Sequence, residues 1–257
     1  MYRFRSLITL PAVAALLAVG ACRSGFQPRQ FGNDHSRLYQ ASLTQLEQER
    51  WDNAIAGFER LTIDLPARDP LLPLSMFHLA EAHSRNDEHL LAAQNYLRVA
   101  ESFPLDTLAD EALLRAGQSY ARMWRKPTLD PQYGEQARST LESMIAIYPE
   151  SPLAERAQAE LAELNDKFAQ KIYNNGMFYM RRNANHSAVI YFRDVVEQYP
   201  ATPTAKAALL RMVEAFREEN WREDAEETCT RLHNQYPSDG TVRELCGAPV
   251  ATATTPD

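Results

Sequence analysis

His78, His83 and His89 lie close together in the sequence and are the first candidates for metal ligands. Zinc sites on one helix usually take two histidines four residues apart, because that spacing puts both side chains on the same face. The separations here are five and six residues, and His83 falls at a position where later parts of the chain carry an aromatic packing residue. We therefore expect core or surface histidines, and we predict no metal and no other cofactor.

Three Glu-Ser pairs are the next candidates for chemistry, since helical lytic transglycosylases use such a pair. Those enzymes continue with stretches rich in Gly and Gln, which do not follow any of the three pairs in this chain. The sequence also contains no glycine-rich phosphate loop and no G-x-S-x-G nucleophile elbow. An enzyme of the transglycosylase type is thus the least favoured interpretation, and we expect no catalytic residue.

Cys229 and Cys246 can form a disulfide that closes a short loop near the end of the chain. Disulfides persist in oxidising compartments, where such a bond would fasten a terminal cap. The alternative is two independent thiols, one of them buried.

Cys22 ends the sequence Val19-Gly20-Ala21-Cys22, which resembles the lipobox of bacterial lipoproteins. Two arginines precede an apolar stretch over residues 7–19, which is too short for a bilayer span of about 20 residues and is typical of a signal peptide. We expect residues 1–21 to be removed and the Cys22 thiol to carry acyl chains that anchor the protein in a membrane. An ordinary signal peptide followed by a cysteine is the alternative.

Arg23 follows the expected lipid site, where an Asp would be the familiar inner-membrane retention signal of Gram-negative bacteria. We therefore expect a protein anchored in the outer membrane and facing the periplasm. The formal net charge of −7 becomes −9 once the two arginines of the signal segment are removed. Because an acidic chain is poorly suited to neutralise phosphates, we expect no nucleic-acid partner.

A pattern of three residues before a proline occurs five times along the chain. The prolines are Pro66, Pro104, Pro149, Pro200 and Pro237. Twelve residues before each stands an alanine, eight before stands a bulky or apolar residue, and five before stands another apolar residue. Steps of four and three place all of them on one helical face. This is the second helix of a tetratricopeptide repeat, in which the alanine lets two helices approach and the proline ends the helix.

The repeats predict an all-α, right-handed tetratricopeptide-type solenoid of about five helix-turn-helix units. We place the units at about 36–67, 71–105, 107–150, 153–201 and 203–238. The first two form an N-terminal part over 36–105, and the other three form a C-terminal part over 107–238.

Four segments fall outside the regular pattern. Residues 22–35 contain Pro, Gly and polar residues and are expected to be a flexible lipidated tether. The prolines of residues 125–132 predict a loop, and residues 153–176 predict one long helix. Residues 239–257 are expected to form a short cap and then a disordered tail.

Arg181, Arg182 and Arg193 form a basic patch on an otherwise acidic chain. Solvent-exposed charge is one interpretation. The other is a docking site for an acidic loop of a partner, because arginine can bind a carboxylate through two hydrogen bonds.

Beside the lipobox, three features resemble the BamD/ComL/YfiO group, the tetratricopeptide lipoproteins of the outer-membrane β-barrel assembly machinery. They are the order of the repeats with an insertion containing Asp130-Pro131 in the third, the long helix that opens the fourth, and the stretch FYMRRNANHSAVIYFRDVVEQYPATPTAKAALLRM. The matching positions are Phe178, Tyr179, Arg182, Ala184, Ala188, Val195, Val196, Tyr199 and Pro200. Tyr191 departs from the pattern, because many members carry an arginine there that can meet the barrel subunit.

The resemblance implies a non-enzymatic scaffold of the barrel assembly complex. Its C-terminal repeats would dock on a BamA-type barrel-forming subunit beside other lipoproteins of the complex, and its N-terminal groove would receive unfolded outer-membrane proteins. Tyr179, Arg181, Arg182 and Arg193 are then the expected partner-docking residues. Another tetratricopeptide lipoprotein of the envelope, such as a pilus or secretin pilot protein or a cell-wall coordination factor, is the alternative.

Overall fold

The computed structural model describes residues 25–248, and every regular element within this range is a helix. The elements are η1 (Pro28–Phe31), α1 (His35–Glu47), α2 (Trp51–Asp64), α3 (Leu71–Arg85), α4 (His89–Ser102), α5 (Ala109–Met123), α6 (Gln132–Ile147), α7 (Ala154–Met180), α8 (Asn185–Gln198), α9 (Pro203–Glu218), α10 (Arg222–Gln235) and α11 (Gly240–Cys246). None of the helices in this range is both long enough and apolar enough to cross a membrane.

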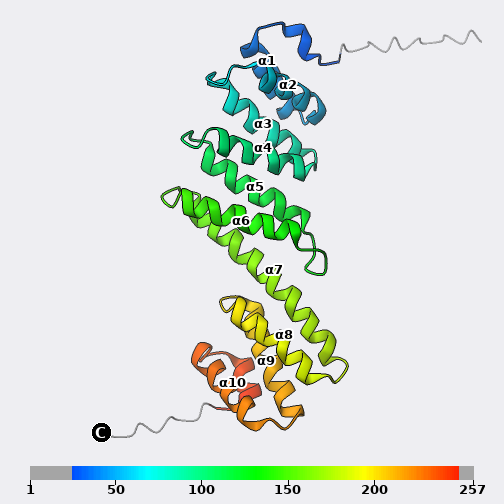
Figure 1. Ribbon diagram of the computed structural model, residues 1–257, viewed down its shortest axis with the longest axis vertical. Helices are drawn as coiled ribbons and strands as arrows, with labels where there is room; N and C mark the ends of the chain where they lie inside the picture. The colour runs from blue at the N-terminus through cyan, green and yellow to red at the C-terminus, as the bar shows by residue number, and fades with distance from the viewer. Residues whose placement is uncertain (1–24, 249–257) are drawn as a thin grey trace, which may run out of the picture.

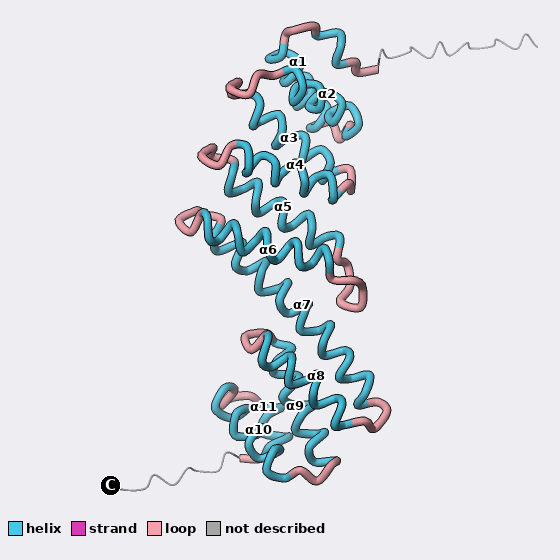
Figure 2. Tube along the Cα trace, in the orientation of Figure 1, coloured by secondary structure: helices cyan, strands magenta, loops and turns pink. Residues whose placement is uncertain are grey.

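Consecutive helices pack as pairs, and the pairs stack in chain order into an elongated solenoid (Figure 1). The five pairs run from α1/α2 to α9/α10, and α11 packs on α10 at the end of the stack. Short turns join the helices along both edges (Figure 2). The predicted all-α, tetratricopeptide-type fold is therefore confirmed.

The residues of the repeat pattern lie in the core of every pair. The five alanines are at most 6% exposed, and the five bulky or apolar residues that follow them are at most 8% exposed. Each second helix ends two residues before its proline. The residue between the helix end and the proline is not helical; Tyr199, for example, has φ −132° and ψ 51°. The proline disfavours the helical conformation in the residue before it.

Two glycines of the first helices show how closely the paired helices approach. A Cβ atom on Gly176 would lie 2.5 Å from the ring of Phe192, and one on Gly117 would lie 2.8 Å from the side chain of Leu141. Phe192 and Leu141 both stand eight residues before a repeat proline. The same two positions therefore meet in two repeats, and neither leaves room for a methyl group on the first helix.

The turn inside four of the repeats contains a left-handed residue that the sequence analysis did not anticipate. These residues are Glu49, Asp87, Asn183 and Asn220, with φ between 58° and 60°. Each stands seventeen residues before its repeat proline. The residue that follows each of them donates its backbone N–H to a carbonyl of the first helix, as Trp221 does to Phe216 at 2.8 Å. This hydrogen bond closes the end of the first helix.

The loop predicted over residues 125–132 lies between α5 and α6 and is fastened to α7. Lys171 donates to the carbonyls of Pro127 and Leu129 at 3.3 and 2.9 Å. One turn earlier, Lys167 donates to the carbonyl of Trp124 and lies 4.9 Å from the centre of its ring. The two lysines therefore hold the loop and the buried Trp124 against the long helix.

The expectation of a flexible tether over residues 22–35 does not hold for residues 25–34. Phe26 and Phe31 pack against the first core, and Arg60 donates to the carbonyl of Gly32 at 3.0 Å. Sequence reasoning missed this docking because neither aromatic falls in the repeat register. Cys22, the expected signal peptide and the tail from residue 249 lie outside the described residues.

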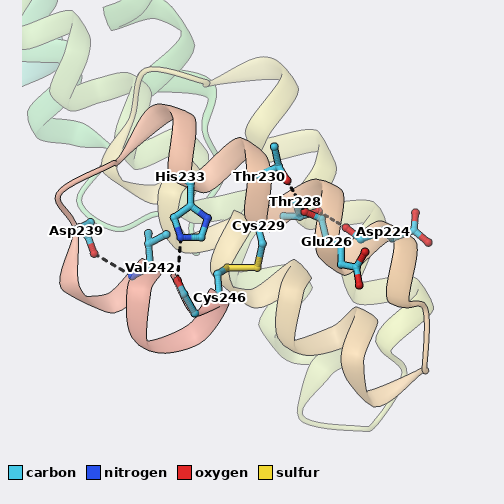
Figure 3. Close-up of a disulfide and its surroundings, with 10 residues drawn as sticks. Asp224, Glu226, Thr228, Cys229, Thr230, His233, Asp239, Val242 and Cys246 are labelled. Carbon is cyan, nitrogen blue, oxygen red and sulfur yellow. Dashed lines mark hydrogen bonds between the residues drawn. A yellow bond between two sulfur atoms is a disulfide. The ribbon is translucent and has the colours of Figure 1, made fainter. Parts of the chain in front are cut away.

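The cap helix α11 is fastened at both ends (Figure 3). At its start, Asp239 accepts the N–H groups of Thr241 and Val242 at 2.9 and 3.2 Å. A hydrogen bond from Lys206 holds the pKa of Asp239 below its ordinary value. At its end, Cys246 is joined to Cys229 by a disulfide, with 5.5 Å between the two Cα atoms.

We expect Gly176→Ala to destabilise the protein, because the new methyl group overlaps the Phe192 ring and overpacking costs about 1–3 kcal/mol. Gly240→Ala is the control, since a Cβ atom there meets nothing within 4 Å. Urea denaturation should give the Gly176 variant a free energy of unfolding lower than the control by about 1 kcal/mol or more. Equal values would contradict the close approach.

Glu49→Gly should stabilise the protein by about 0.5–1 kcal/mol, because glycine adopts the left-handed conformation without steric cost. The neighbouring Gln48→Gly is the control, since Gln48 has an ordinary φ of −85° and gains nothing from glycine. Thermal unfolding followed by circular dichroism would show opposite shifts for the two variants. A shift in the same direction would argue against the turn geometry.

Cys246→Ser should lower the free energy of unfolding by up to about 3 kcal/mol, the value that the chain-entropy model gives for a loop of roughly this length. Denaturation of the wild-type protein under reducing conditions should reproduce the loss. Non-reducing peptide mapping provides the direct check, and recovery of two free thiols at positions 229 and 246 would contradict the bond.

Candidate functional site

A polar groove runs between α3, α5 and the start of α7 and contains a cavity of about 300 Å³. Its lining includes four arginines, two glutamates and several neutral polar side chains. These residues are Glu81, Ser84, Arg85, Tyr96, Glu111, Leu114, Arg115, Gln118, Ser119, Arg122, Leu153 and Arg156.

Arg115 is held in place in this groove by its own neighbours. Its guanidinium group lies 2.6 Å from the Glu111 carboxylate, 3.8 Å from that of Glu81 and 5.2 Å from the centre of the Phe77 ring. Beside it, burial raises the pKa of Tyr96 to about 12, so this hydroxyl stays neutral. Arg115 and Tyr96 therefore form a rigid polar surface rather than a reactive one.

The other arginines of the groove are more exposed and more loosely held. The Arg85 guanidinium lies 3.6 Å from Glu81, and that of Arg156 lies 3.9 Å from Glu160. Both side chains are more than 60% exposed, so these ion pairs are weak. Together with the exposed Arg122, they can turn toward the carbonyl oxygens or carboxylates of a bound chain.

The second candidate surface lies where α7 turns into α8, and we call it the α7–α8 patch. It consists of Phe178, Tyr179, Arg181, Arg182 and Tyr191, with the exposed Ile190 beside Tyr191 on α8. The rings of Tyr179 and Tyr191 stack with 5.3 Å between their centres and 11° between their planes. The Arg182 guanidinium lies 3.5 Å from the centre of the Phe178 ring.

The structure places three of the four sequence-predicted docking residues, Tyr179, Arg181 and Arg182, at this turn and leaves Arg193 further along α8. Arg181 caps the end of α7, Arg182 follows it, and Arg193 is exposed on α8. Within residues 25–248, Arg193 makes no contact with Arg181 or Arg182. Tyr179 instead meets Tyr191, the position at which the chain departs from the family pattern.

Sequence reasoning missed the apolar part of the patch. Phe178 is 43% exposed and Ile190 is 52% exposed, so both can contribute apolar area to a contact with a partner. The spacing of four residues between Phe178 and Arg182 is the signal that could have indicated their contact.

Two of the three clustered histidines pack against neighbouring side chains. His83 is buried, with its Nδ1 atom 2.6 Å from the carboxylate of Glu88, and His78 stacks on Phe58. In the part of the chain that the structure describes, no three His, Cys, Asp or Glu side chains gather as metal ligands would. The remaining predicted pair, Cys229 and Cys246, holds the cap helix.

The sequence model of the family described as outer membrane lipoprotein, YfiO, matches residues 32–232. Three curated relatives carry the name outer membrane protein assembly factor BamD. The Caulobacter vibrioides protein is 22% identical and aligns over 93% of this chain and 79% of its own length. The corresponding values are 25%, 71% and 80% for the Vibrio cholerae protein, and 22%, 88% and 91% for the Rickettsia prowazekii protein. Because the family model covers the five helix pairs almost completely, the chain belongs to the YfiO family of outer membrane lipoproteins.

Proposed function

We propose that the protein is a non-enzymatic scaffold of the β-barrel assembly complex, in which it helps outer-membrane proteins to fold and insert. The observation that carries this proposal is the family match over residues 32–232, which includes both the groove and the α7–α8 patch. The relatives named as outer membrane protein assembly factors support the same role.

The protein acts at the outer membrane, anchored by lipid on Cys22 and with the solenoid in the periplasm. The lipobox-like sequence before Cys22 and the description of the family as lipoproteins support this placement. Acyl chains on one residue contribute about 0.8 kcal/mol for each buried CH₂ group, so several chains anchor a protein stably.

The α7–α8 patch docks on the barrel-forming, BamA-type subunit. Exposed aromatic and arginine side chains are enriched at the centres of protein interfaces, and the patch combines both kinds. The stacked Tyr179 and Tyr191 lose little conformational freedom on binding, because their rings already support one another. Other lipoproteins of the complex are further partners.

The groove of α3, α5 and α7 receives unfolded outer-membrane proteins. The exposed arginines of the groove, Arg85, Arg122 and Arg156, offer hydrogen-bond donors to the unpaired backbone carbonyls of an extended chain. Because the contacts are to backbone and charge rather than to particular side chains, the groove suits many different substrates.

Crosslinked affinity purification of the tagged protein from membranes tests both surfaces. The wild-type protein should recover a large outer-membrane barrel protein with repeated periplasmic domains, together with unfolded substrates. Arg182→Glu in the patch should lose the barrel subunit, because an acidic partner loop would be repelled, and Arg122→Glu in the groove should lose only the substrates. Arg231→Glu on α10, exposed and outside both surfaces, is the control and should behave as the wild type.

The outcome that contradicts the proposal is recovery of pilus, secretin or cell-wall proteins without a barrel-assembly subunit. In that case the protein would be another tetratricopeptide lipoprotein of the envelope.

A further inference from the structure

The polar groove carries positive charge although the chain as a whole is acidic. Its lining contains four arginines and two glutamates, whereas the complete chain has a formal net charge of −7. Both glutamates lie against Arg115, with Glu111 at 2.6 Å and Glu81 at 3.8 Å, and so they neutralise the arginine in the middle of the groove. The charge of the other three arginines is left for a ligand.

One face of α5 forms the floor of the groove. Six residues of this helix line the cavity, and steps of three and four residues place them on one side of the helix. They are Glu111, Leu114, Arg115, Gln118, Ser119 and Arg122. From the first to the last of them the helix rises by about 16 Å. The groove therefore runs along α5, between the helices α3 and α7 that lie on either side of it in the stack (Figure 1).

Contacts between α5 and the segment of α7 show which residues lie level with one another. Asp110, at the start of α5, accepts a hydrogen bond from the Ser151 hydroxyl. Further along, Gln118 donates to the Glu160 carboxylate at 2.7 Å, so the two helices run in the same direction. Arg156 stands one turn before Glu160 and is therefore level with the turn of α5 before Gln118.

The exposed arginines stand at the two ends of this face. Arg156 is level with Leu114, which precedes Arg122 by eight residues, or about 12 Å of helix. On α3, Arg85 is one turn beyond the glutamate that meets Arg115, so it lies toward the Arg122 end. The groove thus has one exposed arginine near one end and two near the other.

An extended chain matches the distance between the two ends. Such a chain rises by about 3.3 Å per residue, so side chains four residues apart are separated by about 13 Å and point to the same side. The same spacing in an α-helix covers only about 6 Å. Arginine suits a carboxylate at each end, because its guanidinium group can donate two hydrogen bonds to the two oxygens.

We propose that the groove binds an extended segment of a partner protein that carries two acidic side chains four residues apart. One carboxylate would pair with Arg156 and the other with Arg122 and Arg85, and the backbone between them would lie along α5. The proposal rests on the substrate role proposed above for the groove and adds the kind of segment that the groove recognises.

The test is a titration of a fluorescently labelled peptide, Gly-Glu-Ser-Thr-Ser-Glu-Gly, with the full-length lipoprotein in detergent, followed by anisotropy. We expect saturable binding. An exposed ion pair contributes up to about fivefold in affinity. The peptide Gly-Ser-Glu-Glu-Thr-Ser-Gly, which has the same composition but adjacent glutamates, can reach only one end and should bind about fivefold more weakly. The peptide with glutamine for both glutamates should bind at least about tenfold more weakly.

Charge reversal in the protein locates the two ends. Arg156→Glu and Arg122→Glu should each weaken binding of the first peptide by at least about fivefold. Each variant should also bind a peptide in which one of the two glutamates is lysine more tightly than the wild type does, because the reversed pair is complementary again. Both arginines are exposed, so circular dichroism should show an unchanged fold. Arg231→Glu on α10 is the control and should leave binding unchanged.

Three results would overturn the proposal. They are absence of saturable binding, equal binding of the spaced and the adjacent glutamates, and binding that neither charge reversal in the groove weakens. If crosslinking still recovers unfolded proteins in such a case, the acidic pair is wrong and the substrate role stands. If crosslinking recovers none, the substrate role of the groove is itself wrong.

Discussion

The structure depends on the close approach of two helices at residues with almost no side chain. In four repeats, a Ser, Ala or Gly of the first helix faces the second helix. The second helix packs a buried alanine and a bulky residue against the first helix there. In repeat one the small partner is Gly57, where a Cβ atom would fall 2.0 Å from the Ser42 hydroxyl. Because one such pair cannot bury its apolar face alone, each pair needs a neighbour, and the stack extends the surface on which binding takes place.

The two candidate surfaces lie on two separate parts of the core, and one long helix connects these parts. The buried residues form two clusters, one that ends at Phe168 and one that begins at Ala169, and the unbroken helix α7 runs through both. The polar groove lies on the first cluster and the α7–α8 patch on the second. Lys167 and Lys171 hold the inserted loop against the middle of this helix, and the hydrogen bonds of Arg138 to Tyr199 and of Thr204 to Asp166 link the two parts beside it.

The repeat register could be predicted from the sequence because the spacing of Ala, bulky residue and proline reports directly on one helical face. The left-handed residues Asp87 and Asn183 carry a weaker signal, since Asp and Asn also occur at many ordinary turns. The stack of Tyr179 on Tyr191 could not be predicted, because it depends on the angle between α7 and α8 rather than on spacing along either. The docking of Phe26 and Phe31 likewise depends on the surface that the first repeat presents.

That docking has a mechanical consequence for an anchored protein. With lipid on Cys22, as proposed, only three residues lie between the anchored residue and Phe26, the first aromatic that packs against the solenoid. The four Cα–Cα steps from Cys22 to Phe26 span at most about 14 Å when the chain is fully extended. The first repeat then stays close to the bilayer surface, while the last repeat can move over a much larger distance. An elongated solenoid on so short a tether gains freedom of movement from the first repeat to the last.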